Sequence, residues 1–496
     1  EQKVKKILAV TLSTLMILAT ATGCLKRVDP DSASDAVIGG NSGDEIDNII
    51  NPDKNMEGKL KIAVPNVDSH IDAIEAFVSS YNEKFPNIDV EITKFDLDQY
   101  KGKVKDFAAA AQAVNRPQDM FDVFWLPQDY INEWYSLRLV GSLDALIEKD
   151  PDVSKDMLIS NAVESSSVNG SLYMMPRDYN QVVMYYNKKM FDDVGMDYPT
   201  SRMDAADFEE MIVELRERLC TSNKTNDYGV KYKEGISCII DCNIKWDSLA
   251  WPLLKSFGGT IVNEQGEVTF DSEENLNAFK YWKSLTENED YACPLAISVE
   301  KGGTNPGIQF RMQQAPLYFQ SRAVAGDIVT STTMGGQTYY GITDLGAAGL
   351  PQFGPTYTIG GGCSGYAVYS EVVNVTEAWQ FVKHVVSVEG QNAYSETGGC
   401  VPVRKDLLED KNAAWRKSLP DVFDAADHEA FVENMDCYAS TRDFYQYIPL
   451  SAQSSILAKI EETFNSMAPL KNDSIMRGTL TSYAQTMQDI INKAKK

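Results

Sequence analysis

The order of apolar and polar residues beyond position 57 predicts alternating strands and helices. Leu60–Val64 alternates in the manner of a strand, and Ile88–Ile92 repeats that pattern. Ile71–Phe85 lies between them and has the spacing of a helix with one buried face. A strand–helix–strand unit indicates a layered α/β lobe, in which ligands meet the carboxyl ends of the strands. That edge here is the loop Asn66–His70.

The next segments extend this lobe and supply candidate chemistry. Val104–Val114 is an Ala-rich helix, and Phe121–Trp125 is an apolar strand followed by Leu-Pro-Gln and then Asp129. An aromatic face stacks on the C–H groups of a sugar ring, while a carboxylate accepts hydrogen bonds from its hydroxyls. Trp125 and Asp129 therefore suit a sugar. A core position for Trp125 is the competing interpretation.

A second pair of strands encloses a polar cluster. Leu172–Met175 and Val182–Tyr186 are apolar, and Arg177–Gln181 between them carries hydrogen-bonding groups behind Pro176. An ordinary β-hairpin with a polar loop explains this stretch. It also fits a chain that crosses between two lobes and lines the space between them.

The start of the chain reads as an export signal. Lys3, Lys5 and Lys6 precede the apolar run Ile7–Ala19, which is too short to span a bilayer comfortably. The Cys24 that follows Thr-Gly resembles the lipidated cysteine of the bacterial lipoprotein lipobox. We expect a signal peptide over 1–23, a flexible polar tether over 24–57, and acyl chains on Cys24 that hold the protein at the membrane surface. An ordinary secretory signal followed by a cysteine is the alternative.

Composition narrows the classes of partner. The net charge of −25 disfavours nucleic acid and anionic membranes, which require rows of Lys and Arg. Seven cysteines follow Cys24, and their spacing forms no zinc site. Cys238 has two candidate disulfide partners, Cys242 and Cys220, and scattered buried thiols are equally compatible with the sequence.

A series of motifs, taken in order over about residues 58–410, resembles one family. The motifs are Asp122–Trp125, Leu139–Leu143, Gly170–Pro176, Tyr185–Lys188, Tyr198–Thr200, Phe257–Asn263, Val268–Ser272, Ala347–Pro351, Gly360–Gly362, Glu377–Val382 and Gly398–Arg404. Together they resemble the extracellular solute-binding proteins of bacterial sugar ABC transporters, the maltose-binding-protein-like group.

The resemblance implies a bilobal α/β fold of the periplasmic-binding-protein type (type II), with two lobes joined by hinge crossovers. Lobe one would comprise 58–176 and 318–386, and lobe two would comprise 177–317 and 387–496. Closure about the hinges would bury a ligand between the lobes.

The resemblance also implies a set of ligand-binding residues. Position 180 carries an amide where the maltose-binding branch has an acid, and Cys363–Tyr366 replaces a usual stacking Trp. We expect Trp246 to bind ligand and Trp251 to lie in the core. The full expected set is Asn66, Asp68, Trp125, Asp129, Asp178, Tyr179, Asn180, Trp246, Gln320, Arg322 and Gly362.

The predicted function is capture of a mono- or oligosaccharide and its delivery to permease subunits, by a lipid-anchored monomer on the outer face of the cell membrane. We expect no catalytic residue, cofactor or metal. A solute-sensing lipoprotein without a transporter is one alternative. A secreted glycoside hydrolase is the other, but acidic residues such as those of Asp207–Glu217 follow a solvated helix face, and His70, His384 and His428 are isolated.

Overall fold

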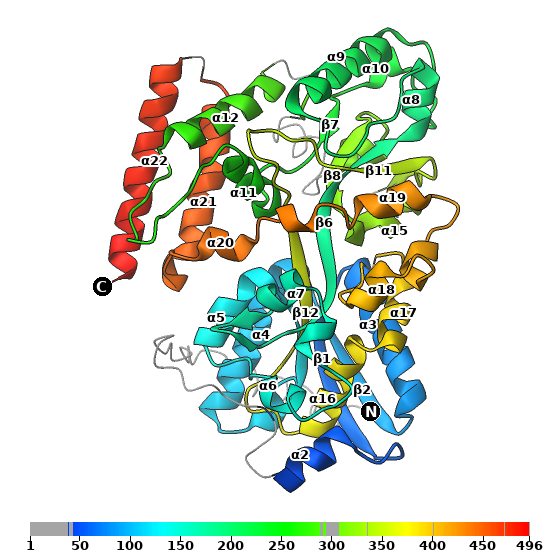
Figure 1. Cartoon of the computed structure of the whole chain (residues 1–496), viewed down its shortest axis with the longest axis vertical. Helices are drawn as coiled ribbons and strands as arrows, with labels where there is room; N and C mark the ends of the chain where they lie inside the picture. Colours follow the sequence, from blue (N-terminus) through cyan, green and yellow to red (C-terminus); the bar gives the residue numbers. More distant parts are fainter. Residues whose placement is uncertain are drawn as a thin grey trace, which may run out of the picture.

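One long strand, β6 (Met175–Asn187), runs through the middle of the protein and belongs to both halves of its sheet (Figure 1). All 13 of its residues are buried. The computed structural model describes residues 38, 43–287, 291–293, 307–334, 336–399, 401–470 and 472–495. The polar cluster of the sequence thus lies inside a continuous strand and is not the loop of a hairpin.

The lower half of the sheet has the strand order β2-β1-β3-β12-β6. β1 (Gly58–Pro65) pairs in parallel with β2 (Ile88–Phe95) and β3 (Val123–Pro127). β12 (Gly361–Val368) runs antiparallel between β3 and the first half of β6. The strands predicted at 60–64, 88–92 and 121–125 are confirmed, the last shifted by two residues, and the carboxyl ends of β1 and β3 face the upper half. The strand predicted at Leu172–Met175 is wrong, because Tyr173 and Met174 lie between the short strand β5 (Ser171–Leu172) and β6.

Helices cover this lower half because each presents one apolar stripe. α3 (Asp68–Lys84) buries Ala73, Ile74, Phe77 and Tyr81, as its spacing predicts, although it begins three residues earlier than expected. The other helices here are α4 (Leu97–Ala113), α5 (Ile131–Ser136), α6 (Asp144–Ile147), α7 (Ser160–Ser165), α16 (Val375–Val385), α17 (Val388–Ser395) and α18 (Lys405–Glu409).

The upper half is built on the second half of β6. This half of β6 pairs antiparallel with β8 (Leu317–Ser321) and β11 (Leu345–Gly349), and β8 pairs in parallel with β7 (Ile240–Asp241). Its helices are α8 (Lys188–Val194), α9 (Ala205–Thr221), α10 (Tyr232–Gly235), α11 (Asp247–Ser256), α12 (Glu273–Thr286), α14 (Ile308–Arg311), α15 (Ala325–Val329), α19 (Ala425–Ala430), α20 (Thr441–Tyr445), α21 (Leu450–Met467) and α22 (Asp473–Ala494).

Short elements complete the chain. They are the strands β4 (Ser167–Val168), β5 (Ser171–Leu172), β9 (Thr332–Met334) and β10 (Gln337–Tyr339), and the 3-10 helices η2 (Pro117–Asp119), η3 (Gln128–Tyr130), η4 (Lys155–Met157), η5 (Arg322–Val324), η6 (Ala414–Lys417) and η7 (Met435–Cys437).

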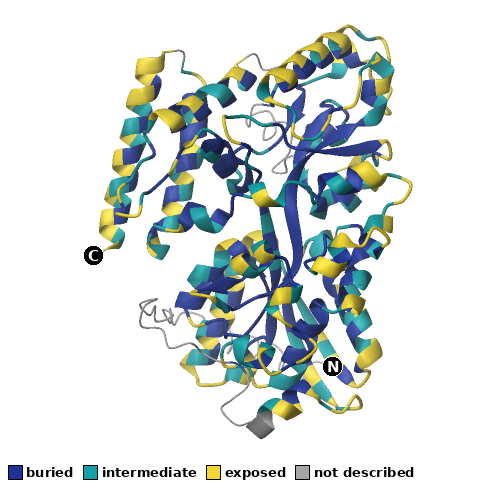
Figure 2. Ribbon diagram, viewed as in Figure 1, coloured by how far each residue is buried: buried dark blue, intermediate teal, exposed yellow. Residues whose placement is uncertain are grey.

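Two large apolar cores fill the protein, and β6, whose residues are all buried, contributes to both (Figure 2). One core extends from the lower half into the upper half, since it includes Tyr179, Val183 and Tyr185 of β6, and the other, the upper core, includes Val182. β8 and β11 pair with the upper half of β6, whereas α17 packs against α3 in the lower half. The predicted mixture of α and β layers is confirmed, while the predicted lobe boundaries at 176, 317 and 386 stay a prediction.

Part of the expected tether is ordered structure. α2 (Gly43–Ile50) docks on α16, and the side chain of Gln380 donates hydrogen bonds to the carbonyls of Ile49 (2.8 Å) and Ile50 (3.0 Å). Ile38 is also buried, with its side chain against Gly141. The expectation of a flexible tether is wrong for these residues, because three isoleucines supply an apolar face to α2. The signal peptide over 1–23 and Cys24 lie outside the described residues.

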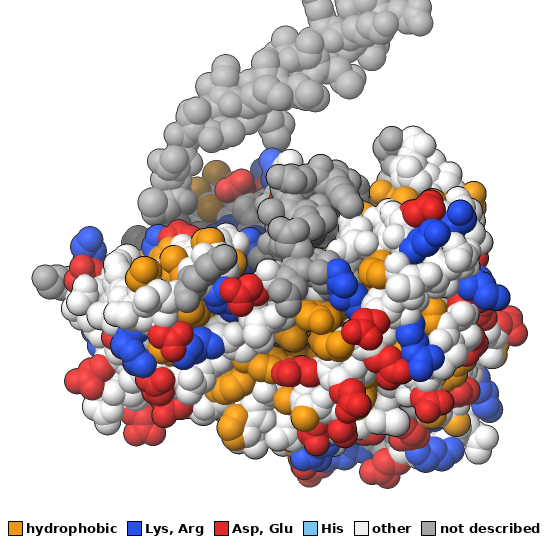
Figure 3. Space-filling model, turned by 90° about the horizontal axis from the view of Figure 1, so that it is seen from above, with side chains coloured by type: hydrophobic (Ala, Val, Ile, Leu, Met, Phe, Trp, Pro, Cys, Tyr) orange, Lys and Arg blue, Asp and Glu red, His pale blue; other side chains and the backbone are white. Residues whose placement is uncertain are grey.

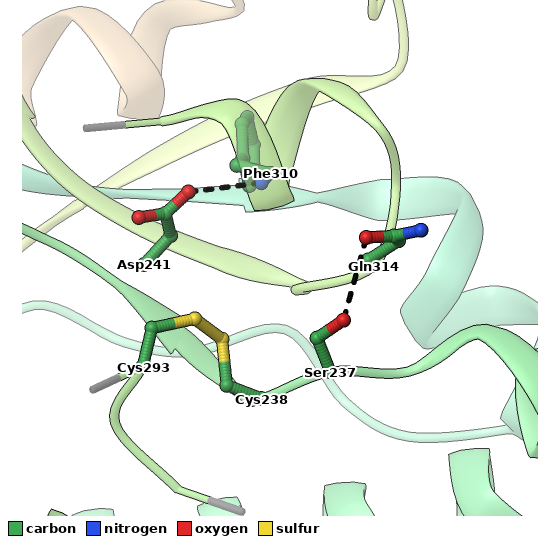
Figure 4. Close-up of a disulfide and its surroundings, with 6 residues drawn as sticks. All are labelled: Ser237, Cys238, Asp241, Cys293, Phe310 and Gln314. Carbon is green, nitrogen blue, oxygen red and sulfur yellow. Dashed lines mark hydrogen bonds between the residues drawn. A yellow bond between two sulfur atoms is a disulfide. The ribbon is translucent and has the colours of Figure 1, made fainter. Parts of the chain in front are cut away.

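A disulfide joins Cys238 to Cys293, with the two Cα atoms 5.3 Å apart (Figure 4). The partners suggested by the sequence, Cys220 and Cys242, are wrong. β7 begins two residues after Cys238 and ends just before Cys242, and an extended chain carries a residue four positions on too far away to bond. Beside the disulfide, the buried carboxylate of Asp241 accepts a hydrogen bond from the backbone N–H of Phe310 (3.1 Å) in α14.

The outer surface of the upper half carries both signs of charge. Seen from above, acidic and basic side chains are interspersed around a central strip of apolar ones (Figure 3). Across the part of the chain that the structure describes, no helix is both long and apolar enough to cross a membrane.

Candidate functional site

Three of the predicted residues lie where the chain passes between its halves. Gly362 of β12 lies opposite Asn180 of β6, and Ser364 lies opposite Pro127 of β3. The pairing of β3 ends there, and η3 begins with Gln128, whose side chain contacts both neighbours of Gly362: its amide donates to the carbonyl of Gly361 (3.5 Å) and its Oε1 accepts from the N–H of Cys363 (3.2 Å). Asp129 is the next residue of η3. We call Asp129, Gly362 and Asn180 the crossing row.

The crossing row borders open space. A Cβ placed on Gly362 would have no other atom within 4 Å. Asn180 is only 8% exposed, and its Oδ1 has no hydrogen-bond partner among the described residues. Directly opposed residues of an antiparallel pair point to the same face. A buried amide oxygen able to accept a hydrogen bond therefore lies beside room for a ligand.

The upper half meets the crossing row at the N-terminus of α11. The hydroxyl of Ser248 donates to the carbonyl of Gly361 (3.1 Å), as do the hydroxyl of Tyr438 (3.1 Å) and, from the lower half, the amide of Gln128 (3.5 Å). One carbonyl thus joins both halves, at a place we call the seam. Asp129 follows Gln128 and Asp247 precedes Ser248, so the two carboxylates approach the seam from opposite sides.

Asp247 is the residue that the sequence analysis missed. Trp246, which was expected to bind ligand, is the residue before α11 and lies half-buried against the upper core. Asp247 is the first residue of the helix, where an acid is common because the N-terminal N–H groups favour negative charge. Its position directly after a candidate Trp was the only available signal, and a helix-capping role explained the residue without a ligand.

Both carboxyl groups are shifted toward the protonated state. Burial, followed by the charge of Asp129, raises the pKa of Asp247 to about 7. Burial also raises the pKa of Asp129, although the charge of Lys101 acts against it. Tyr445 of α20 has a raised pKa, first from burial and then from both of these carboxylates. Carboxylates in such a site gain from hydroxyl donors, which stabilise the ionised form.

Trp125 makes the contacts of a core residue. Its side chain is 7% exposed, with the ring 4.5 Å from His70 and edge-on to Tyr100 at 5.6 Å. His70 in turn lies 3.0 Å from the guanidinium of Arg177, and burial followed by that charge holds the pKa of His70 well below its usual range. These contacts favour the core interpretation of Trp125 over stacking on a ligand.

Asp178 and Tyr179 face into the protein. The carboxylate of Asp178 accepts hydrogen bonds from Arg177 Nε (3.0 Å), Tyr394 OH (3.0 Å), and both the N–H (3.2 Å) and hydroxyl (3.1 Å) of Ser364. Tyr179 has no exposed surface and packs edge-on against Tyr438. Four donors satisfy the two oxygens of Asp178, so this residue fixes β6 and β12 instead of reaching a ligand.

Arg322 is fully buried, contrary to its expected place in the site. It donates to the carbonyl of Gly398 (3.1 Å) and the hydroxyl of Ser418 (2.8 Å), and its guanidinium lies 4.7 Å from the ring of Phe431. These contacts tie distant segments together and leave Arg322 no face toward the seam. Gln320 likewise bonds within β8, where its Oε1 accepts from Ser321 N–H (2.8 Å).

Asn66 and Asp68 lie away from the crossing row. Asn66 is exposed, with its amide 3.5 Å from Asp96. Asp68, at the start of α3, borders a separate cavity of about 380 Å³. Residues of α15 form the opposite wall of this cavity, and Asp72 and Asp327 also line it. The structure thus places Gly362 opposite Asn180, with Asp129 and Trp246 in the segments that reach the seam from the two halves, and the other predicted residues make internal contacts or lie away from this place.

Comparison with known proteins now decides the family. The sequence profile of bacterial extracellular solute-binding proteins matches residues 76–422, more than half of the chain. The chain belongs to this family. It is also 21% identical, over 222 residues, to the arabinooligosaccharide-binding protein of Halalkalibacterium halodurans, covering 44% of this chain and 43% of that one. This solute-binding protein spans about half the length of the curated relatives it matches.

Solved structures share the fold. The ABC substrate-binding protein Lmo0181 of Listeria monocytogenes, in complex with cycloalternan, has a TM-score of 0.66 at 16% identity, covering 88% of this chain and 100% of that one. UgpB of Mycobacterium tuberculosis, in complex with glycerophosphocholine, has a TM-score of 0.65 at 18% identity, with 89% and 100% covered. The predicted two-lobed periplasmic-binding-protein-like fold is confirmed.

Within the residues that the structure describes, no three His, Cys, Asp or Glu side chains are grouped to hold a metal ion. The three histidines are also dispersed. His428 contacts Arg322 and His384 contacts Ser80, so each takes part in internal packing.

Proposed function

We propose that this solute-binding protein captures a carbohydrate at the crossing row and passes it, chemically unchanged, to the permease of an ABC transporter. In this proposal Cys24 carries the lipid that keeps the protein at the outer face of the membrane. The observation that carries the proposal is the convergence, from both halves, of acceptor oxygens on one open space. Sugar hydroxyls are donors that match such acceptors.

The energetics are sufficient for capture. Each hydroxyl bonded to a carboxylate or to Asn180 contributes a net of about 0.5–1.5 kcal/mol, and buried ring surface adds about 25 cal/mol per Å². A few such contacts, less the cost of ordering the two halves, reach about −8 kcal/mol, which corresponds to micromolar affinity. A ligand that binds both halves at once favours the closed arrangement by that differential affinity.

Names of similar proteins support a sugar without fixing one. The Halalkalibacterium relative is named for arabinooligosaccharides and the Listeria structure holds cycloalternan, whereas the Mycobacterium structure holds glycerophosphocholine. Sugar ligands are thus represented among relatives, and so is a polar ligand of another class. The same cleft without a permease would serve a sensor, and neighbouring permease genes would favour transport.

A glycoside hydrolase is the second candidate, because two carboxyl groups with raised pKa face one space. Hydrolases of the common kind hold two carboxyls at a fixed separation and push their pKa values apart, so that one is an acid and the other is ionised. Asp129 and Asp247 stand on different halves and both shift upward. This arrangement favours reversible binding. Chromatography of recovered sugar separates the two candidates, since binding returns it intact.

The experiment that tests the proposal is a thermal melt of the purified protein with a panel of mono- and oligosaccharides. A ligand that binds only the folded state stabilises it by about 2.7 kcal/mol at a hundredfold excess over its dissociation constant. We expect at least one sugar to raise Tm. A panel of amino acids and peptides is the control, and a shift there, with none from any sugar, would defeat the carbohydrate assignment.

A further inference from the structure

Among the described residues, most of the charges that act on the two carboxylates at the seam are acidic. The charged groups that act on Asp247 are Asp129 from η3 and Glu461 from α21, both acidic. Lys101 is the cation that acts on Asp129, but it is already paired with Glu133 at 2.6 Å. Neither Asp129 nor Asp247 forms a salt bridge within the described part of the chain.

Two cations on the upper half are paired elsewhere, and Lys245, two residues before Asp247, is not among the charges that act on it. Lys255 of α11 is paired with Asp443 at 3.0 Å, and Arg442 of α20 donates to the carbonyl of Glu164. The residues of α20 and α21 that act on Asp247 or respond to it are Tyr445 and Glu461, which bring no positive charge. The seam therefore carries uncompensated negative charge.

A hydrogen-bond acceptor for a ligand also lies at the seam. Asn180 is more than nine-tenths buried, and its Oδ1 is unpartnered next to the open space at Gly362. Its carbonyl oxygen, like the two carboxylates, presents lone pairs. Such a set of oxygens accepts hydrogen bonds from hydroxyl or ammonium groups and offers no hydrogen-bond donor to an anion.

We propose that Asp129 and Asp247 act as a charge filter, so that the seam accepts neutral and amine-bearing sugars and rejects sugar acids and sugar phosphates. This inference rests on the proposed carbohydrate function and narrows its ligand class. Above about pH 7, where Asp247 is ionised, a carboxylate or phosphate on the ligand would face two like charges, and like charges placed together at an interface reduce affinity strongly.

The repulsion between Asp129 and Asp247 also disfavours the closed arrangement of the two halves when no ligand is bound. Asp129 belongs to the lower half and Asp247 to the upper half, so their repulsion is greatest when the seam is closed. Hydroxyls that donate to both carboxylates replace this repulsion with two charge-assisted hydrogen bonds. The correct ligand therefore gains affinity from the same groups that exclude the wrong one.

The experiment uses sugars matched in shape and different in charge. Glucose, glucosamine and glucuronate form one series, galactose, galactosamine and galacturonate a second, and di- and trisaccharides of these units extend both. Each is added to wild-type protein, Asp247→Asn, Asp129→Asn and the control Asp421→Asn, which makes the same change in net charge at an exposed position. The measurements are the Tm shift and the dissociation constant.

We expect at least tenfold weaker binding of the uronate than of its neutral partner in the wild type, and a ratio about tenfold smaller in each seam variant. Asp421→Asn keeps the wild-type ratio. Equal binding of the uronate and the neutral sugar by the wild type would overturn the filter and leave the carbohydrate proposal standing.

The ligand-free protein gives an independent measurement. The pKa of the Asp247 carboxyl rises from 3.8 to about 7 on folding, so the unfolded chain ionises first and stability falls as the pH rises from about 4 to about 7 and then stays constant. Asp247→Asn should therefore melt several degrees above wild type at pH 8 and approach the wild-type temperature only near pH 4. If no sugar of any charge binds, the carbohydrate proposal fails. Equal melting of the variant and wild type at pH 8 would then still overturn the filter.

Discussion

At the scale of single residues, Trp125 shows that the same side chain suits a ligand and a core. It stands at the carboxyl end of a strand, where binding residues gather, yet His70, Tyr100 and Tyr130 surround its ring. Its indole N–H has no hydrogen-bond partner among the described residues. These three rings surround the indole of Trp125, so packing in the core explains its position better than stacking on a sugar does.

We expect Trp125→Ala to lower the free energy of unfolding by about 3–5 kcal/mol, because a buried indole is lost and a cavity remains. The folded fraction should bind a sugar identified by melting with an affinity within about twofold of wild type. Chemical denaturation and calorimetric titration measure the two quantities. Trp125→Phe keeps much of the packing and is the control. A tenfold loss of affinity with little loss of stability would instead place the ring on the ligand.

Polarity alone could not separate the binding residues from the buried ones. Asn180 was predicted and lies opposite the open space at Gly362, whereas Asp178 and Arg322 were predicted on the same grounds and are satisfied within the protein. Whether a polar group has partners depends on segments far away in the sequence. The partners of Arg322 lie between positions 398 and 431, which no local pattern relates to position 322.

At the scale of elements, the disulfide between Cys238 and Cys293 fastens the segment before β7 to a chain position 55 residues later. Periodicity is local, so it revealed the first strands and helices of the lower half and the second half of β6, whereas most of the shorter elements and the C-terminal helices were not predicted. Disulfide pairing depends on the distance between Cα atoms in the folded state, which spacing along the chain does not report.

Removing this disulfide should destabilise the protein by about 2–4 kcal/mol, because the unfolded chain gains the freedom of a long loop. The test is the Tm of the Cys238→Ser, Cys293→Ser double variant, with and without a reductant. Reductant should lower the Tm of wild type and leave the variant unchanged. Cys437→Ser, which removes a half-exposed thiol outside the disulfide, should melt like wild type. A reductant-insensitive wild type would argue against the bond.

At the scale of the whole molecule, β6 makes the two halves interdependent. Its first half pairs with β12, and its second half pairs with β8 and β11. The order of motifs predicted this two-lobed fold over most of the chain. The residues at which the chain passes from one lobe to the other are harder to predict. Later segments of the chain return to either half, and their strands pair with β6 on both of its edges.

We expect one cooperative thermal transition for the ligand-free protein. β6 is shared by both halves of the protein. Unfolding of either half would remove strand partners from part of β6, so the two halves should melt together. Scanning calorimetry tests this by comparing the calorimetric with the van't Hoff enthalpy, which agree for a two-state transition. Two resolved peaks would contradict the coupling, and a saturating sugar should move a single peak as a unit.

The open space beside Asn180 exists because position 362 is a glycine, and its backbone does not have the positive φ that would demand one. A bulky aromatic side chain at position 362 would fill the space proposed for the ligand and leave the strand pairing intact. Within the proposed transport role, such a variant would still be produced and exported. It would compete with the wild-type protein for the transporter without delivering a ligand.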